Sequence, residues 1–242
     1  MAGRYTSRGI VLSTVKYGES SMVLQMLTED VGRQSFMVQG IRSSKGRGSK
    51  MALLQPLFAL EYEATKPTRG ELHRLNQMQS GITLQRTPFD IRRSSIALFI
   101  AEVIYRLIRE SEPNDQLFGF VWGSIEALDT IEEGVANFHL WFLSNLARLM
   151  GYSPGNDHRY GAWFDPREGL YTPFQPNISS ALNPDNAVIL RDFLECDVQH
   201  LGEIGLNRQQ RVLFLDGLLA YLGYHLNIKE SVESTKILRE LF

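Results

Sequence analysis

Residues 9–28 read GIVLSTVKYGESSMVLQMLT, two β-rich runs joined by the turn Gly18-Glu19-Ser20. Branched and aromatic side chains favour strands, whereas Gly with polar neighbours favours a tight turn. Two such runs this close together predict a β-hairpin, with strands over residues 9–17 and 21–28. The chain is therefore expected to open with a sheet.

The strand pattern continues to about residue 84. A second turn ends at Gly32, which can take positive φ, and leads into a predicted strand over residues 33–39. Residues 56–65 alternate at strand spacing, and residues 72–84 form a weaker strand pattern. These short strands, joined by hairpins and one longer loop, predict a small antiparallel barrel. The oligonucleotide-binding (OB) barrel is the obvious candidate, and we assign it residues 1–84.

After residue 85 the apolar period changes to that of helices. Residues 94–110, 115–133 and 138–150 place apolar side chains at helical spacing. A domain of helices is therefore expected over residues 85–242.

Capping motifs predict where later helices begin. Asn183-Pro184-Asp185 combines an N-cap, a first-turn proline and an acid, and opens a helix to about Glu195. Asn207 with Gln210 resembles a capping box for a helix over residues 208–226. A short amphipathic helix is expected over residues 234–242.

Residues 151–177 interrupt these helices. Four prolines, four glycines and several aromatic side chains occupy this segment and exclude a helix. We expect an ordered insert of turns, with a hairpin held by aromatic side chains, since a structureless loop of this length is unusual. The predicted fold class is α+β and multi-domain: an N-terminal OB-fold antiparallel β-barrel, followed by an α-helical domain with an irregular insert.

Composition excludes several classes of protein. With 43% apolar residues in 242, the chain can bury a core, so wholesale disorder is excluded. No apolar stretch is long enough to span a bilayer, so we expect no membrane association and a cytoplasmic location. The single Cys196 excludes an intrachain disulfide and a multi-cysteine zinc site, and is expected to be a core side chain.

Charge is distributed unevenly along the chain. Residues 1–80 carry 11 Lys and Arg against 6 Asp and Glu, a net charge of +5. Since the net charge of the whole chain is −2, residues 81–242 carry a net charge of −7. Residues 40–50, GIRSSKGRGSK, hold four cations and no acid among Gly and Ser. A flexible basic loop suits a phosphate backbone. The alternative is a solvated loop with no ligand.

Basic side chains of the barrel are the candidate phosphate contacts. The first-rank candidates are Arg42, Lys45, Arg47 and Lys50, and the second-rank candidates are Arg33, Arg4, Arg69 and Arg74. Aromatic side chains of the barrel could stack on bases, and the candidates are Tyr17, Phe36, Phe58 and Tyr62. Alternation buries about half of such rings. Tyr17, beside a turn, is therefore the preferred stacking residue.

No catalytic set is predicted. Asp157 and His158, with Asp165 and Glu168, form the only dense set of ligand-type side chains, and such residues are usually found in turns. An enzyme centred on Asp157 and His158 remains a weaker alternative. Residues 46–50 have glycines but lack the spacing of a nucleotide-binding P-loop, so ATP hydrolysis is not predicted.

An ordered set of short motifs resembles the opening of the bacterial recombination mediator family RecO. The set comprises Gly9-Ile10-Val11-Leu12, Tyr17-Gly18-Glu19-Ser20, Leu27-Thr28, Gly32-Arg33, Gly40-Ile41-Arg42-Ser43 and Leu54-Gln55-Pro56. The resemblance implies a non-enzymatic DNA repair protein that binds single- and double-stranded DNA and anneals strands. The resemblance also implies that the protein binds RecR, the C-terminal tail of the single-stranded-DNA-binding protein SSB and, in some settings, RecF. With these partners it would help to load RecA on DNA at the bacterial nucleoid.

The chain departs from this family in one respect. Many members carry a four-cysteine zinc knuckle in the helical domain, and residues 151–177 contain no cysteine. We therefore expect no zinc and no other cofactor. The acidic, aromatic-rich helical domain is expected to dock proteins, and the chain is expected to be monomeric or weakly associating. The alternative function is an OB-fold protein-interaction module without direct DNA binding.

Overall fold

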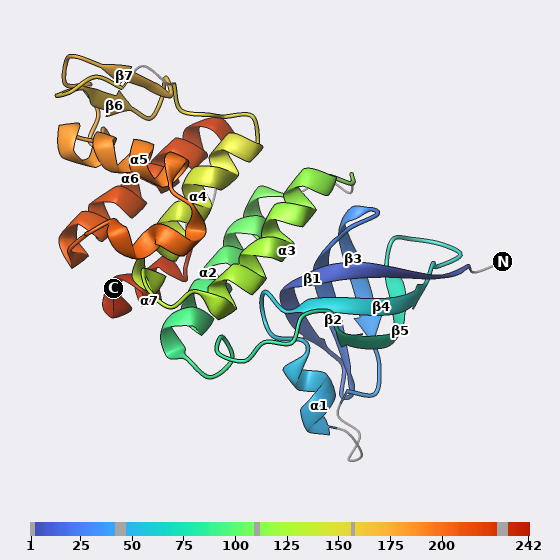
Figure 1. Cartoon of the computed structure of the whole chain (residues 1–242). Coiled ribbons are helices and arrows are strands. Elements are labelled where there is room, and N and C mark those ends of the chain that lie inside the picture. The colour runs from blue at the N-terminus through green and yellow to red at the C-terminus, as the bar shows by residue number, and fades with distance from the viewer. Residues whose placement is uncertain (1–2, 42–46, 109–111, 156–157, 227–231) are drawn as a thin grey trace. The chain divides into compact units, whose positions relative to one another are not determined.

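The computed structural model describes residues 3–41, 47–108, 112–155, 158–226 and 232–242 (Figure 1). Within these residues, the first part of the chain is a closed barrel with strand order β1-β2-β3-β5-β4. Its strands are β1 (Arg4–Tyr17), β2 (Ser21–Thr28), β3 (Gly32–Val38), β4 (Ala59–Thr65) and β5 (His73–Ser80). This OB-like barrel confirms the predicted fold of the N-terminal part.

The length of β1 explains how the barrel closes. Its second half pairs with β2 and its first half with β4, both antiparallel, with a register shift between Val11 and Ser13. β3 and β5 pair in parallel. Because a bulge bends a strand, one strand can lie along both sides of the closure. The sequence placed the start of this strand at Gly9, five residues too late, because Arg4–Arg8 mixes polar residues into the pattern.

A short helix, α1 (Arg47–Ala52), lies between β3 and β4. We expected a loop through Lys50, and the helix corrects that expectation for its last four residues. Gly48 and Ser49 are poor helix formers, so propensity alone argues against it. Ile41 and Leu54, on either side of this connection, are both buried in the barrel core, so the barrel fixes both ends of the segment that contains the helix.

Aromatic side chains fill the barrel interior. Phe36 and Tyr62 are 0% and 4% exposed, and their ring centroids lie 5.1 Å apart, edge to face. The apolar side chains of Leu24 and Met26 complete the packing around them. Two of the four candidate stacking rings are therefore core residues.

The rest of the chain is mainly helical, as predicted. The helices are α2 (Ile91–Leu107), α3 (Asp115–Thr130), η1 (Val135–Asn137), α4 (Phe138–Leu149), α5 (Pro184–Glu195), η2 (Val198–Glu203), α6 (Arg208–Leu226) and α7 (Thr235–Leu241). Among the described residues, no helix combines the length and apolarity needed to cross a membrane.

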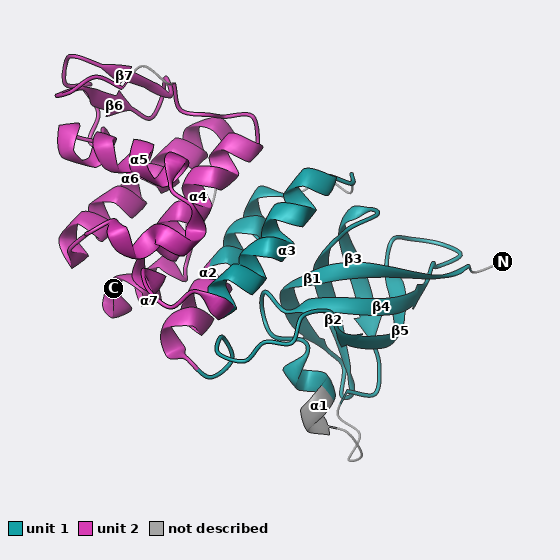
Figure 2. Ribbon diagram, in the orientation of Figure 1, with its two compact units in different colours: residues 1–89, 100–129 teal, residues 90–99, 130–242 magenta. Residues whose placement is uncertain are grey.

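The chain forms two compact units, shown in Figure 2. The first comprises residues 1–89 and 100–129, that is the barrel, α1, α3 and the later part of α2. The second comprises residues 90–99 and 130–242, with the remaining helices and the insert. We refer to them as the barrel unit and the helical unit.

The predicted caps begin α5 and α6. The Asn183 side chain accepts the N–H of Asn186 at 3.0 Å. Asn207 and Gln210 bond reciprocally, each side-chain oxygen accepting the other residue's N–H at 2.9 Å. Both motifs are thus confirmed, because side-chain oxygens satisfy N–H groups that the first helical turn leaves free.

The insert contains the predicted hairpin, formed by β6 (Trp163–Asp165) and β7 (Leu170–Thr172). Aromatic packing connects it to α6, with Phe164 and Tyr221 ring centroids 5.5 Å apart. The Tyr221 hydroxyl also donates to the Tyr152 carbonyl at 2.9 Å.

Asp129, at the end of α3, holds the chain that leaves the barrel. Its carboxylate is 6% exposed and accepts the backbone N–H groups of Gln85, Arg86 and Thr87 at 2.9, 2.9 and 2.7 Å. Burial by itself would raise the pKa of this carboxyl, but the three N–H groups together outweigh it and the pKa is lowered.

Arg8 on β1 connects the barrel to α3. Its guanidinium lies over the Trp122 ring at 5.0 Å, and its Nε donates to Glu29 at 2.8 Å. Arg8 and Asp129 therefore both link α3 to the rest of the barrel unit.

Candidate nucleic-acid interface

The described part of the candidate interface begins at the β1–β2 turn. The N–H of Ile41 donates to the Ser20 carbonyl at 3.2 Å, so the chain that enters residues 42–50 starts beside this turn. Tyr17, at the end of β1, is 60% exposed, and Lys16 next to it is also exposed. Bases stack on exposed aromatic rings and phosphates attract cations, so this turn stays the predicted contact.

Of the four first-rank candidate cations, only two lie within the described residues. Arg42 and Lys45 lie outside the described residues. The backbone of Arg47 begins α1, and Lys50 lies in the last turn of that helix with an exposed side chain. Their assignment as phosphate contacts stays a prediction.

Neighbouring strands bring Arg4 and Arg74 to one place. Thr65 on β4 pairs with Arg4 on one side and with Arg74 on the other. The two arginines line a shallow hollow of about 500 Å³, together with Glu63 and Asn76. The Arg4 guanidinium lies 3.7 Å from the Glu63 carboxylate, so a phosphate there would compete with an ion pair. Arg74 is exposed.

Arg33 has a structural role that the sequence did not suggest. Its Nη1 donates to the carbonyls of Tyr105 and Ile108 at 3.0 and 3.1 Å, and its guanidinium lies 4.2 Å from the Tyr105 ring centroid. The carbonyl end of a helix attracts a cation. This contact explains Arg33 without a phosphate, and we leave it out of the interface proposed below.

Arg69 lies in the connection between β4 and β5 and is exposed. Lys66 in the same connection places its ammonium 5.7 Å from the Tyr5 ring centroid. In OB barrels this connection and the β1–β2 turn flank the binding face. Arg69 therefore remains a second-rank candidate, and Lys66 joins it.

Of the four candidate rings, Tyr17 is the most exposed. Phe58 is half-buried and packs against the barrel core, which also contains Phe36 and Tyr62. Two further exposed residues, Val15 and Lys16, directly precede this ring and were not among the predicted site residues. Val15 is 61% exposed, an unusual position for a branched apolar residue that alternation along β1 could have revealed.

Another hollow of the barrel is acidic. It measures about 580 Å³ and is lined by Glu29, Asp30, Glu61 and Glu63 beside Arg8. The bond from Arg8, against a smaller opposing effect of burial, lowers the pKa of Glu29, so this carboxylate is ionised at neutral pH. Phosphate would be repelled there, which favours the β1–β2 turn as the nucleic-acid side.

The acidic and histidine side chains of the insert that could bind a metal or act in catalysis do not come together among the described residues. Asp157 lies outside the described residues, and the His158 ring meets the Tyr171 ring edge-on at 5.1 Å. Asp165 is paired with Arg167 at 2.9 Å, and this bond is the main reason for its lowered pKa. Among the residues that the structure describes, no group of three or more His, Cys, Asp or Glu could hold a metal ion.

Comparison with known proteins covers nearly the whole chain. A family model described as Recombination protein O N terminal matches residues 1–81, and one described as Recombination protein O C terminal matches residues 88–233. A Bacteroides fragilis protein named DNA repair protein RecO is 37% identical over 97% of both chains. Proteins of the same name from Phocaeicola vulgatus and Porphyromonas gingivalis are 32% and 31% identical over 97% and 98% of both chains.

Proposed function

The chain belongs to the RecO family of DNA repair proteins, and on that premise we propose that it is a recombination mediator. It binds single- and double-stranded DNA through the barrel unit, anneals complementary strands, and helps to load the recombinase on SSB-coated DNA. It makes and breaks no covalent bond. The observation that carries this proposal is the exposed Tyr17 beside Lys16, at the turn where the chain enters its basic segment.

The proposed DNA site combines stacking and charge. Tyr17 would stack on a base, while Lys16, Lys50 and the cations at 42, 45 and 47 would contact phosphates. Arg69, Arg74 and Arg4 would extend the path along the barrel. Because screened phosphates repel each other less, two strands held this way could approach and pair.

The proposed partners follow from the family. RecR, the C-terminal tail of SSB and in some settings RecF would bind the chain, and RecA would be affected indirectly. A protein with this task acts on chromosomal DNA in the bacterial cytoplasm. We assign protein docking mainly to the helical unit.

The test is an anisotropy titration of a labelled single-stranded oligonucleotide of about 30 nucleotides, long enough for more than one OB site. If four cations each neutralise one phosphate, log K against log salt should fall with a slope of roughly −3. Changing Arg42, Lys45, Arg47 and Lys50 to Glu should abolish binding. A slope near zero, or native-like binding by this variant, would contradict the proposed site.

A second pair of variants uses described side chains only. Lys16→Glu with Lys50→Glu should weaken DNA binding at least tenfold. The control, Arg92→Glu with Arg159→Glu, makes the same change in net charge at two exposed positions of the helical unit. Equal losses in both would mean that overall charge, and not this site, governs binding. Absence of DNA binding by the native protein at low salt would favour the alternative, a protein-interaction module.

A further inference from the structure

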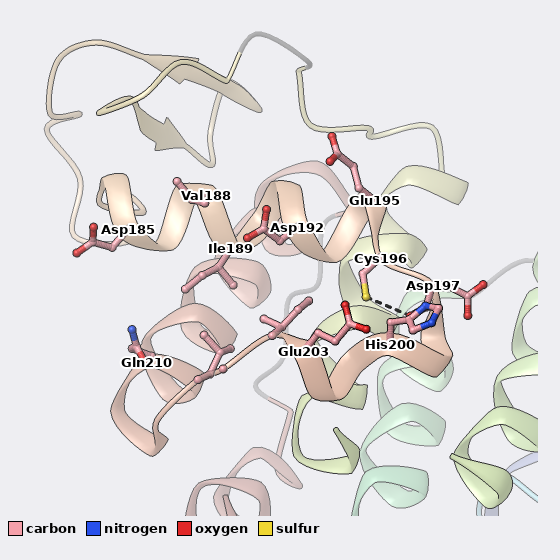
Figure 3. Close-up of a pocket in the computed structure, with 13 residues that line it drawn as sticks. Asp185, Val188, Ile189, Asp192, Glu195, Cys196, Asp197, His200, Glu203 and Gln210 are labelled. Carbon is pink, nitrogen blue, oxygen red and sulfur yellow. Dashed lines mark hydrogen bonds between the residues drawn. The ribbon is translucent and has the colours of Figure 1, made fainter. Parts of the chain in front are cut away.

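A groove of about 780 Å³ lies within the helical unit, between α5 and the chain that leads into α6 (Figure 3). One wall is a single face of α5, where Asp185, Val188, Asp192 and Glu195 follow each other at helical spacing. The other wall is formed by η2 and residues 203–206. Asp185 to Glu195 spans about 15 Å at 1.5 Å per residue, the length of an opposing helix of three turns.

The groove is lined by several carboxylates, one of which forms an ion pair at its edge. Among the described residues, five acids and no Lys or Arg line it: Asp185, Asp192, Glu195, Asp197 and Glu203. Asp192 is paired with Arg191 at 2.7 Å, and Asp197 accepts the Gln199 N–H at 2.9 Å. Glu195 and Glu203 make no ion pair with any residue that the structure describes. Gathering like charges is unfavourable for the isolated chain.

The Cys196 thiol lies in the same groove, near several of these carboxylates. Burial raises its pKa, and the carboxylates of Glu203, Asp197 and Asp192 raise it further.

Apolar side chains form the floor between the acids. Val188 on α5 faces the groove with Ile204 and Leu206 from the other wall, and all three are only half-buried. An apolar strip with acidic margins complements a helix that has an apolar stripe flanked by Lys and Arg.

We propose that this groove docks a basic amphipathic segment of a partner protein. The apolar side chains of that segment lie on Val188, Ile204 and Leu206, and its cations reach Glu195 and Glu203. Nucleic acid is disfavoured because its phosphates would face the five carboxylates. The chain's own basic segment, residues 42–50, has charge but no apolar residue larger than Gly, so it lacks the stripe that the floor requires. The proposal adds a surface and a partner chemistry to the proposed function and does not depend on DNA binding.

The probe is a labelled synthetic 14-residue peptide with Leu on one helical face and Lys on its flanks, titrated with the full chain and followed by anisotropy. A scrambled peptide of the same composition is the ligand control. Glu195→Lys with Glu203→Lys should weaken peptide binding at least tenfold. Glu168→Lys with Glu240→Lys makes the same change in net charge at exposed positions that do not line the groove, and should stay within twofold of native.

Three results would overturn the proposal. Equal binding of the scrambled peptide, or equal loss in both variants, would reduce the effect to net charge. Self-association of the native chain that the groove variant abolishes in sedimentation would assign the groove to a second copy.

If the Lys variant has a lowered melting temperature by circular dichroism, Glu195→Gln with Glu203→Gln replaces it, and a threefold loss of peptide binding is expected. DNA binding by the groove variant is measured as well. If it is unchanged while peptide binding is lost, the loss belongs to the groove and not to a failure of the proposed DNA-binding function.

Discussion

Replacing Asp129 by asparagine measures how firmly residues 85–87 are held to α3. The carboxylate accepts three backbone N–H groups at 2.7–2.9 Å and is 6% exposed. Asparagine keeps one oxygen but turns an NH₂ group toward a backbone donor. Hydrogen bonds to a charged acceptor contribute about 1.5–3 kcal/mol each, so losing one or two of the three should cost about 1.5–6 kcal/mol.

The assay is urea unfolding followed by far-UV circular dichroism and by tryptophan fluorescence, to which Trp122 of the barrel unit contributes together with Trp141 and Trp163 of the helical unit. Asp30→Asn is the matched control. Asp30 is exposed in the β2–β3 turn, and its loss should change the free energy of unfolding by less than about 0.5 kcal/mol.

The pH dependence supplies an independent check. The folded pKa of Asp129 is lowered, so its contribution is fully present above the unfolded value of about 3.9 and is lost as pH falls through the folded pKa. The stability gap between native and Asp129→Asn should therefore shrink as pH is taken below about 4. A gap no larger than that of the Asp30 control, or one that widens in acid, would refute this reasoning.

Three further predictions concern the barrel turns, the stacking ring and the helix caps. Tyr17→Ala should weaken single-stranded DNA binding by about 1–3 kcal/mol in an anisotropy titration, whereas Val15→Ala should leave it within about threefold; equal effects would argue against stacking. Gly32→Ala should cost at least about 2 kcal/mol in urea unfolding, because φ is 74° and a Cβ would lie 2.2 Å from the Glu112 carbonyl oxygen. A loss below about 0.5 kcal/mol would mean that this contact relaxes freely. Asn207→Ala should cost about 1 kcal/mol, seen as a lower melting temperature, and if the pair acts as a unit, adding Gln210→Ala should then cost little more.

Most helices and strands of the fold could be predicted from local sequence patterns. The run of branched residues in β2 and the caps of α5 and α6 depend on neighbours within four residues, so sequence alone could place them. The ends of elements were harder. The first residues of β1 are polar and become strand only because β4 lies alongside them, a partner about 60 residues away.

The site was less accessible to prediction than the fold. Tyr17 could be chosen because it adjoins a turn, but the role of Arg33 depends on carbonyls of Tyr105 and Ile108, more than 70 residues further on. The groove beside α5 is formed by one continuous stretch, residues 185–210, that folds back on itself, and its 3-10 helix has no strong sequence signal. Charge counts gave the acidic character of the helical part but could not say where the carboxylates gather.

The strand order of the barrel also has a consequence during synthesis on the ribosome. The edge of β3 that pairs with β5 must wait for a strand that begins at His73, 35 residues after β3 ends at Val38. At about 5–20 residues per second, the nascent sheet spends about 2–7 s with this edge uncovered. β4 emerges before β5 and can pair with β1 first, so the β3–β5 pairing is the one that closes the barrel. Delays in translating residues 39–80 would prolong the period in which two nascent chains can pair through their open edges.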